Sequence, residues 1–254
     1  MITDEEQKRY ARQILMIGEE GQEKLKAASV LVAGAGGLGT VISLYLAAAG
    51  VGHLRIIDCD VVDTSNLNRQ ILHWSKDVGR PKTASVEEKL TALNPLIHIE
   101  TDAGRITEET VGELVRGHCS TGSRPPSSPQ LIIDAMDNFP TRYLLNQAAI
   151  ERNIPFIHGA VRGFFGQMTT VIPGKGPCLR CLFPASPPHE LFPIVGATCG
   201  VIGSIEAAEA IKLITGQGEP LMGRIFIWDG LAGSADSITV ERDPACPDCG
   251  HLKL

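Results

Sequence analysis

Residues 29–58 read SVLVAGAGGLGTVISLYLAAAGVGHLRIID, and this stretch decides the fold. Residues 29–33 are almost wholly apolar, as in a buried strand, and Gly34, Gly36 and Gly39 follow in the spacing G-x-G-x-x-G. A helix is expected over residues 38–49 with Gly50 as its C-cap, and a second strand over 53–58 that ends on an acid. Strand, glycine turn, helix and strand in this order are typical of a βαβ unit that places backbone N–H groups against phosphate.

Alternating strands and helices continue along the chain. Helices are expected at residues 4–15, 19–27, 82–93, 107–115 and 140–151, and strands at 97–101, 131–134 and 155–158. This alternation predicts an α/β fold with a Rossmann-like, mainly parallel sheet flanked by helices. After Gly166 the strands at 167–172, 224–228 and 237–240 are expected to close the sheet in antiparallel fashion.

The helix expected over residues 201–214 carries Glu206, Glu209 and Lys212 on one narrow face, so the rest of it is predicted to be buried. Residues 117–130 are rich in serine and proline and predict a flexible surface insertion. We therefore expect one domain over residues 1–254, with residues 1–27 as N-terminal helices.

The composition limits the class of partner. A net charge of −6 in 254 residues gives no excess of positive charge that would attract nucleic acid or an anionic membrane. The acidic, polar start (MITDEE) differs from a secretory or transit peptide, so a cytoplasmic protein is expected. Residues 27–54 lack charged side chains apart from His53, but the glycines at their centre argue against a membrane span.

Cations gather around the predicted nucleotide site. The number of cations, Arg12, Arg69 and Lys82, is larger than the pyrophosphate of a dinucleotide needs. An acid, Asp137, follows the strand at 131–134. The set suits ATP, with the acid holding Mg²⁺ and the cations neutralising the phosphates. A nicotinamide-dependent oxidoreductase shows the same glycine fingerprint, and each residue taken singly is more often a solvated charge or a cap.

Four of the seven cysteines form two Cys-x-x-Cys pairs, Cys178 with Cys181 and Cys246 with Cys249. Two such pairs predict a structural Zn²⁺ site with four thiolates and no open position, although two reduced pairs remain an alternative. Cys199 is interpreted as a packing residue at the start of a helix.

The chain resembles the MoeB/ThiF/HesA group of ubiquitin-activating-enzyme-like adenylyltransferases over nearly its whole length. The resemblance rests on several motifs found in order: RYARQ from Arg9, the glycine turn with Asp58, SNLNRQ from Ser65, GRPK from Gly79, Asp137-Asn138 followed by Arg142, GAVR from Gly159, and GVIGS from Gly200.

That resemblance implies ATP-dependent adenylation of the C-terminal carboxylate of a ubiquitin-like, β-grasp sulfur carrier ending in Gly-Gly. It implies a homodimer in which Arg12 reaches the neighbouring site. No rhodanese-like domain follows in this sequence, so a separate protein is expected to be the sulfur donor. Adenylation of a peptide or a tRNA base, and a non-catalytic zinc-stabilised binding protein, remain alternatives. The residues expected at the nucleotide are Gly34, Gly36, Gly37, Gly39, Asp58, Asp60, Asn66, Arg69, Gln70, Lys82, Asp137 and Asn138, with Arg12, Arg69, Lys82 and Asp137 expected to be catalytic.

Overall fold

A computed structural model describes residues 1–116, 128–186 and 192–252. Its helices are α1 (Asp4–Arg9), α2 (Ala11–Ala27), α3 (Gly37–Ala49), α4 (Lys82–Leu93), α5 (Val111–Arg116), α6 (Phe139–Arg152), α7 (Leu179–Leu182) and α8 (Gly196–Thr215). Its strands are β1 (Ser29–Ala33), β2 (His53–Ile57), β3 (His98–Asp102), β4 (Leu131–Asp134), β5 (Phe156–Arg162), β6 (Phe165–Val171), β7 (Arg224–Asp229) and β8 (Ser234–Thr239). Most of the predicted insertion at 117–130 lies outside the described residues.

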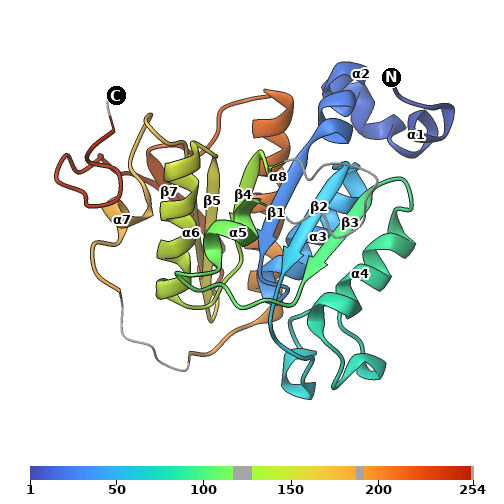
Figure 1. Cartoon of the computed structure of the whole chain (residues 1–254), viewed down its shortest axis with the longest axis horizontal. Coiled ribbons are helices and arrows are strands. Elements are labelled where there is room, and N and C mark those ends of the chain that lie inside the picture. Colours follow the sequence, from blue (N-terminus) through green and yellow to red (C-terminus); the bar gives the residue numbers. More distant parts are fainter. Residues whose placement is uncertain (117–127, 187–191, 253–254) are drawn as a thin grey trace.

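One sheet runs through the molecule in the order β3-β2-β1-β4-β5-β6-β7-β8 (Figure 1). The strands from β3 to β5 pair in parallel, and those from β5 to β8 pair in antiparallel fashion. The predicted parallel sheet with antiparallel closing strands is therefore confirmed. Because the parallel strands share one direction, β1, β2 and β4 end at the same edge, where open α/β sheets bind ligands.

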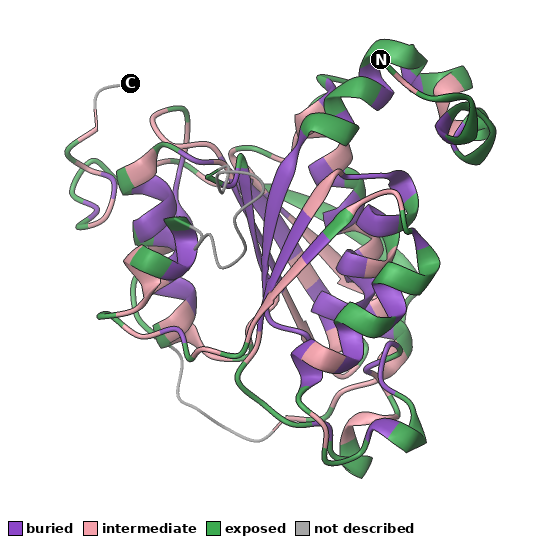
Figure 2. Ribbon diagram, turned by 45° about the vertical axis from the view of Figure 1, so that its right-hand side comes forward, coloured by how far each residue is buried: buried purple, intermediate pink, exposed green. Residues whose placement is uncertain are grey.

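The central strands are coloured as buried in Figure 2, and apolar side chains fill both of their faces. Leu38, Ile42 and Leu46 of α3 pack on one face together with α4 and α8, whereas α5, α6 and α7 cover the other. Burial on both faces explains why β1 is apolar throughout, without polar alternation. Gly50 ends α3 in the left-handed conformation at φ 81°, as predicted.

Helix α8 differs from its prediction. It begins at Gly196, and two of the three residues on the charged face predicted to be exposed are buried, Glu206 at 0% and Glu209 at 2% exposure, whereas Lys212 is partly exposed. Glu209 accepts hydrogen bonds from Thr170 Oγ1 at 2.8 Å and the Leu221 N–H at 2.7 Å, so polar groups of the sheet side satisfy it. The charge pattern alone did not reveal these partners.

The N-terminal helices also differ in their boundaries. The first ends at Arg9, and α2 then continues to Ala27 through a kink at Gly18, where φ is 73°. The uncharged stretch at 27–54 forms β1, the glycine turn and α3. Among the described residues, no helix is long and apolar enough to cross a membrane.

Candidate nucleotide-binding site and cysteine cluster

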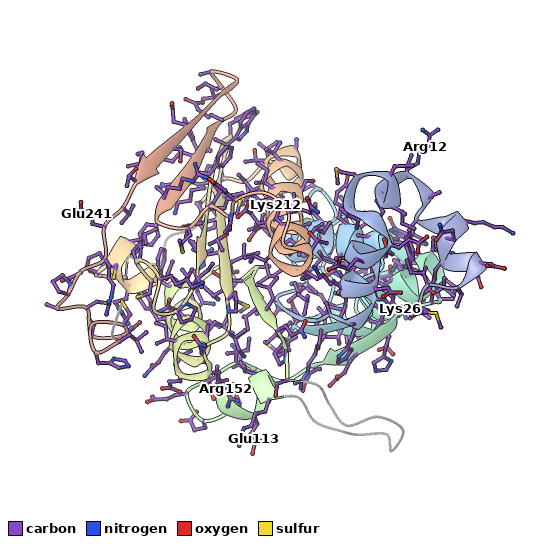
Figure 3. All side chains as sticks on the ribbon, turned by 90° about the horizontal axis from the view of Figure 1, so that it is seen from above. Arg12, Lys26, Glu113, Arg152, Lys212 and Glu241 are labelled. Carbon is purple, nitrogen blue, oxygen red and sulfur yellow. The ribbon has the colours of Figure 1, made fainter. Side chains whose placement is uncertain are left out.

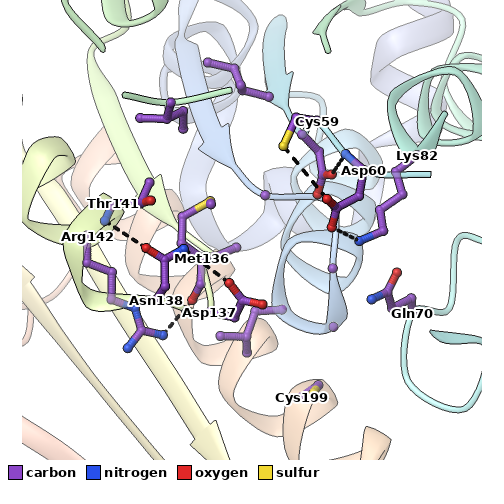
Figure 4. A pocket seen from close by; sticks show the side chains of 18 of the residues that line it. Cys59, Asp60, Gln70, Lys82, Met136, Asp137, Asn138, Thr141, Arg142 and Cys199 are labelled. Atoms are coloured by element: carbon purple, nitrogen blue, oxygen red, sulfur yellow. Dashed lines mark hydrogen bonds and ion pairs between the residues drawn. The ribbon is translucent and has the colours of Figure 1, made fainter. Parts of the chain in front are cut away.

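A cavity of about 560 Å³ opens at the carboxyl ends of β1, β2 and β4 (Figure 4). Among the predicted residues, its wall contains Gly34, Gly36, Gly37, Asp58, Asp60, Arg69, Gln70, Lys82, Asp137 and Asn138. Gly39 and Asn66 lie outside that wall, and Arg12 points into solvent from α2 (Figure 3). The structure thus gathers most of the predicted set, and it leaves Arg12 away from this chain's own cavity.

The glycine turn depends on two close backbone approaches. Gly34 has φ 108°, and a Cβ there would lie 2.7 Å from the carbonyl oxygen of Ala135, which directly follows β4. A Cβ on Gly39 would lie 1.9 Å from the Gly34 carbonyl oxygen. Gly39 therefore shapes the turn without lining the cavity. The carboxylate of Asp58 holds the turn from β2, because its Oδ2 accepts the Ala35 N–H at 2.7 Å.

A buried chain of hydrogen bonds also fixes this turn, and no pattern in the sequence predicted it. The Lys89 ammonium, which can only donate, bonds Asp77 Oδ2 at 2.5 Å and Ser85 Oγ at 2.8 Å. The Ser85 hydroxyl is then free to donate to His73 Nδ1 at 2.9 Å, and His73 Nε2–H donates to the Ala35 carbonyl at 2.9 Å. Burial lowers the pKa of His73, which keeps the imidazole neutral for this role.

The cations on one side of the cavity differ in their partners. The buried Lys82 ammonium bonds Asp60 Oδ2 at 2.9 Å, and Asp60 is largely exposed (Figure 4). Arg69 bonds only neutral oxygens, the Ser65 carbonyl at 2.9 Å and Asn68 Oδ1 at 3.0 Å, and has no ion pair among the described residues. Arg69 therefore offers an anion a positive charge that no acid among the described residues pairs with.

The opposite side presents an acid. Asp137 is exposed, and its one hydrogen bond within the described residues comes from the Asn138 amide at 3.3 Å. Asn138 Oδ1 caps α6 by accepting the Thr141 N–H at 2.9 Å. Arg142 bridges the carbonyls of Met136 at 2.6 Å and Gly159 at 3.4 Å, so it fixes the loop that carries Asp137.

Arg105 is a wall residue that the sequence analysis missed. It lies in the irregular segment between β3 and α5, where no periodicity or strand end marks a side chain as functional. Its exposed guanidinium has no ion pair among the described residues, so it adds a further cation at the mouth of the cavity.

These residues fit a nucleoside triphosphate and a divalent cation. The Gly36–Gly37 backbone at the start of α3 and the cations Arg69 and Lys82 offer donors to phosphate oxygens. Gln70 Oε1 is buried without a hydrogen-bond partner in the described part of the chain, so a ligand donor would satisfy it. The carboxylate of Asp137 is the type of oxygen ligand that Mg²⁺ prefers.

Cys199 packs beneath the glycine turn and lines the cavity floor. A Cβ on Gly37 would lie 2.7 Å from its Sγ, and the side chain is fully buried. Burial raises the pKa of Cys199 to about 11, so the thiol is protonated at neutral pH and is a poor nucleophile.

We expect Cys199→Ala to leave ATP–pyrophosphate exchange intact and to reduce the free energy of unfolding by about 1 kcal/mol, because it removes only one buried sulfur atom. Exchange assays and denaturant unfolding check both numbers. A covalent intermediate between enzyme and substrate that is lost in Cys199→Ala would show that the thiol reacts.

The two Cys-x-x-Cys pairs meet on the other face of the sheet, beside α6 and α7. Sγ atoms lie 3.9 Å apart for Cys178 and Cys181, 3.6 Å for Cys178 and Cys246, and 3.5 Å for Cys181 and Cys249. A tetrahedral zinc with Zn–S bonds of about 2.3 Å separates its sulfurs by about 3.8 Å, so the four thiols fit that geometry. The predicted ligand set is thus brought together.

Around the cluster, polar side chains hold the segment of the first cysteine pair, Cys178 and Cys181, in place. Asn146 Oδ1 accepts the Leu179 N–H at 3.0 Å, and its amide donates to Asp248 Oδ2 at 2.8 Å. Asn146 is fully buried on α6, so the helix links both cysteine pairs. Such outer contacts fix the orientation of metal ligands.

Replacing Cys178 with serine should abolish stoichiometric zinc and reduce the free energy of unfolding by more than about 2 kcal/mol, because metal binding and folding are coupled. Exchange activity of the folded fraction should stay close to that of the unaltered protein, because these cysteines do not line the nucleotide cavity. Metal analysis and thermal unfolding test this, with Cys59→Ser as a cysteine control outside the cluster. Equal zinc content in both variants would contradict the assignment.

Comparisons with known proteins identify the family. The ThiF family matches residues 10–248. The chain is 43% identical to a sulfur carrier protein adenylyltransferase of Thermus thermophilus, over 98% of this chain and 92% of that protein. It is 42% identical to the SAMP-activating enzyme E1 of Haloferax volcanii, over 96% and 88%.

Among solved structures, MccB of E. coli superposes with a TM-score of 0.83 at 24% identity, covering 96% of this chain and 75% of that chain, a likeness of fold alone. The length of the family match and the identity to these relatives agree with the motifs and with the cavity they build. The chain belongs to the ThiF family.

Proposed function

We propose that this protein uses ATP to adenylate the C-terminal carboxylate of a ubiquitin-like sulfur carrier, releasing pyrophosphate. The names of the Thermus and Haloferax relatives, which the chain matches over most of their length, support the activity. The observation that carries the proposal is the continuity between the nucleotide cavity and a second groove.

That second groove has a volume of about 760 Å³ and lies beside β5, β6 and α6. Its aromatic wall consists of Phe139, Phe165, Phe183 and Phe192. The groove and the nucleotide cavity share seven residues: Arg105, Asp137, Asn138, Thr141, Arg142, Val161 and Phe192. An extended peptide end lying in the groove would bring its carboxylate to the residues that the two spaces share.

The wall of this groove combines aromatic rings with glycine. Gly166 lies in the wall on β6, and a side chain there would meet Ile202 of α8 at 2.3 Å, so glycine lets α8 pack closely behind the wall. Aromatic rings along the groove suit a terminal Gly-Gly, whose lack of side chains lets the carboxylate advance between them.

The reaction needs charge neutralisation rather than proton transfer. One carboxylate oxygen of the carrier attacks the α-phosphorus, the bond from that phosphorus to the bridging oxygen breaks, and pyrophosphate leaves with the electron pair. Arg69 and Lys82 hold the phosphate oxygens and offset the repulsion between the two anions. Asp137 would hold Mg²⁺, which would neutralise further phosphate charge.

Sulfur transfer then requires an outside source of sulfur in this proposal. Among the described cysteines, Cys59 and Cys199 line the nucleotide cavity, and burial raises the pKa of both thiols. Neither is a ready thiolate at neutral pH. A separate donor therefore delivers sulfur to the acyl adenylate, while zinc at the cysteine cluster serves stability.

A homodimer completes the site in the same proposal. On α2, Leu15 is 83% and Met16 75% exposed, and both lie on the face of the helix that carries Arg12. Helix α8 leaves Val201 and Ile205 only half-buried. Docking of these apolar surfaces across a two-fold axis would cover them and carry Arg12 towards the partner's cavity.

The test is ATP–pyrophosphate exchange with purified carriers. Exchange should require a ubiquitin-like carrier with a free Gly-Gly end, and amidation of that end should abolish it. Exchange that proceeds equally with the amidated carrier, or with an unrelated short peptide in place of every carrier, would overturn the proposed substrate class.

A further inference from the structure

A second group of metal-ligating side chains lies at the far end of the sheet from the nucleotide cavity. His53 begins β2, and His98 and Glu100 lie on β3. Their ligand atoms all lie within 4.8 Å of one another. The cluster is half-buried to exposed, so ions in solution can reach it.

Strand register brings the three side chains together. His53 pairs with His98 in the parallel ladder, and Glu100 follows two residues later on the same face of β3. The imidazole rings stack with centroids 5.0 Å apart and planes inclined by 29°. Because β3 is the edge strand, one side of the cluster is open to solvent.

His53 is held in a ligand-like orientation by contacts on both ring nitrogens. Its Nδ1 lies 3.0 Å from Ser29 Oγ, and its Nε2 lies 3.0 Å from Glu100 Oε2. When Nδ1–H donates to the hydroxyl, the Nε2 lone pair faces a carboxylate oxygen. In this tautomer both atoms are acceptors, and a cation can lie between them; in the other tautomer Nε2–H donates to Glu100, and a bound cation would take the place of that proton.

Glu100 is likewise oriented from outside the cluster. Its Oε1 lies 3.1 Å from Arg55 Nε, which leaves Oε2 directed at His53. Metal-binding histidines and carboxylates commonly have such outer partners, which fix the ligand atoms in place. The orientation of two of the three ligands is thus set before an ion arrives.

We infer that His53, His98 and Glu100 bind one divalent transition ion, such as Zn²⁺, with at least one coordination position left to water. Two imidazoles and a carboxylate are typical ligands of zinc and cobalt. The cluster lies at the amino ends of β2 and β3, whereas the nucleotide cavity lies at the carboxyl ends. Ion binding would link the edge strand β3 to its neighbour β2, and the ion would not contact ATP.

The test uses full-length protein with zinc already bound at the four cysteines, and Co²⁺ as the probe. Equilibrium dialysis should show one additional Co²⁺ per chain, with weak visible bands and no thiolate-to-cobalt charge transfer. His98→Gln should weaken this binding by at least about tenfold, and Glu100→Gln should do the same. His251→Gln, which removes another exposed histidine, should leave it unchanged.

A second measurement does not depend on any variant. One equivalent of Zn²⁺ added to the zinc-loaded protein should shift the NMR signals of the His53 and His98 rings and not those of His251. Pyrophosphate exchange by His98→Gln should match that of the unaltered protein. Unchanged Co²⁺ affinity in both ligand variants, or unshifted His53 and His98 signals, would overturn the inference.

Discussion

ATP–pyrophosphate exchange is expected to fall by about a hundredfold or more when Arg69 is replaced by alanine, and Lys82→Ala and Asp137→Ala should have effects of the same scale. Each removes a charge that stabilises the transition state for attack on the α-phosphate. The three residues line one cavity but come from separate segments of the chain. Single-turnover formation of the acyl adenylate, measured with each purified variant, gives the loss directly.

Folding should be nearly unchanged in these variants. Arg69 bonds only neutral oxygens, Asp137 is exposed, and the carboxylate left by Lys82→Ala is that of Asp60, which is 60% exposed. Lys24→Ala is a matched control, because Lys24 lies in an exposed pair with Glu20 far from the cavity. Near-normal exchange in all three variants would show that the cavity is wrongly assigned.

The largest recovery of activity is expected from mixing two inactive proteins. Arg12→Ala and Asp137→Ala should each be nearly inactive, because each site would need Arg12 from one subunit and Asp137 from the other. After subunit exchange about half the dimers are mixed, and each holds one intact site, so about a quarter of normal activity should return. Native mass spectrometry measures the fraction of mixed dimers.

The position of Arg12 makes this experiment decisive. The side chain is exposed on α2 and lies outside the wall of its own cavity (Figure 3). If Arg12 acted within its own chain, no mixed dimer would hold a complete site, and mixing would recover nothing. That result, with exchange of subunits demonstrated, would refute the shared site and leave the adenylation chemistry untouched.

Sequence patterns predicted the parts of the fold that local chemistry determines. The glycine turn and Gly50 were predictable because close backbone approach and a left-handed cap leave few other residues. The cysteine cluster was predictable because paired thiols at short spacing have few structural uses. The strand ends then placed Asp58 and Asp137 at one edge of the sheet.

The errors arose where partners come from distant segments. Glu209 looked like a surface residue until Thr170 and Leu221 appeared as its partners. Arg105 reaches the cavity from an irregular segment, and no local pattern marks it. The chain of hydrogen bonds from Lys89 to His73 depends on tertiary packing of a helix against the glycine turn, which spacing along the chain does not encode.

Glu206 gives the fold a dependence on proton concentration. Its carboxyl group lies where a side chain of Gly159 would be, and neither oxygen has a hydrogen-bond partner in the described part of the chain. Burial, aided by the nearby charge of Asp134, raises the pKa of Glu206 well above its ordinary value. At pH values between the unfolded-state pKa and this raised native-state pKa, folding is therefore coupled to the uptake of a proton by Glu206.

The sign of that coupling follows from linkage. The unfolded chain releases the proton at the ordinary glutamate pKa, about 4.3, whereas the native protein retains it to higher pH. The contribution of Glu206 to stability is full below the unfolded-state pKa and declines as pH rises towards the raised native-state value. A rise in pH should therefore reduce the free energy of unfolding through the packing of Glu206 on α8 against Gly159 of β5.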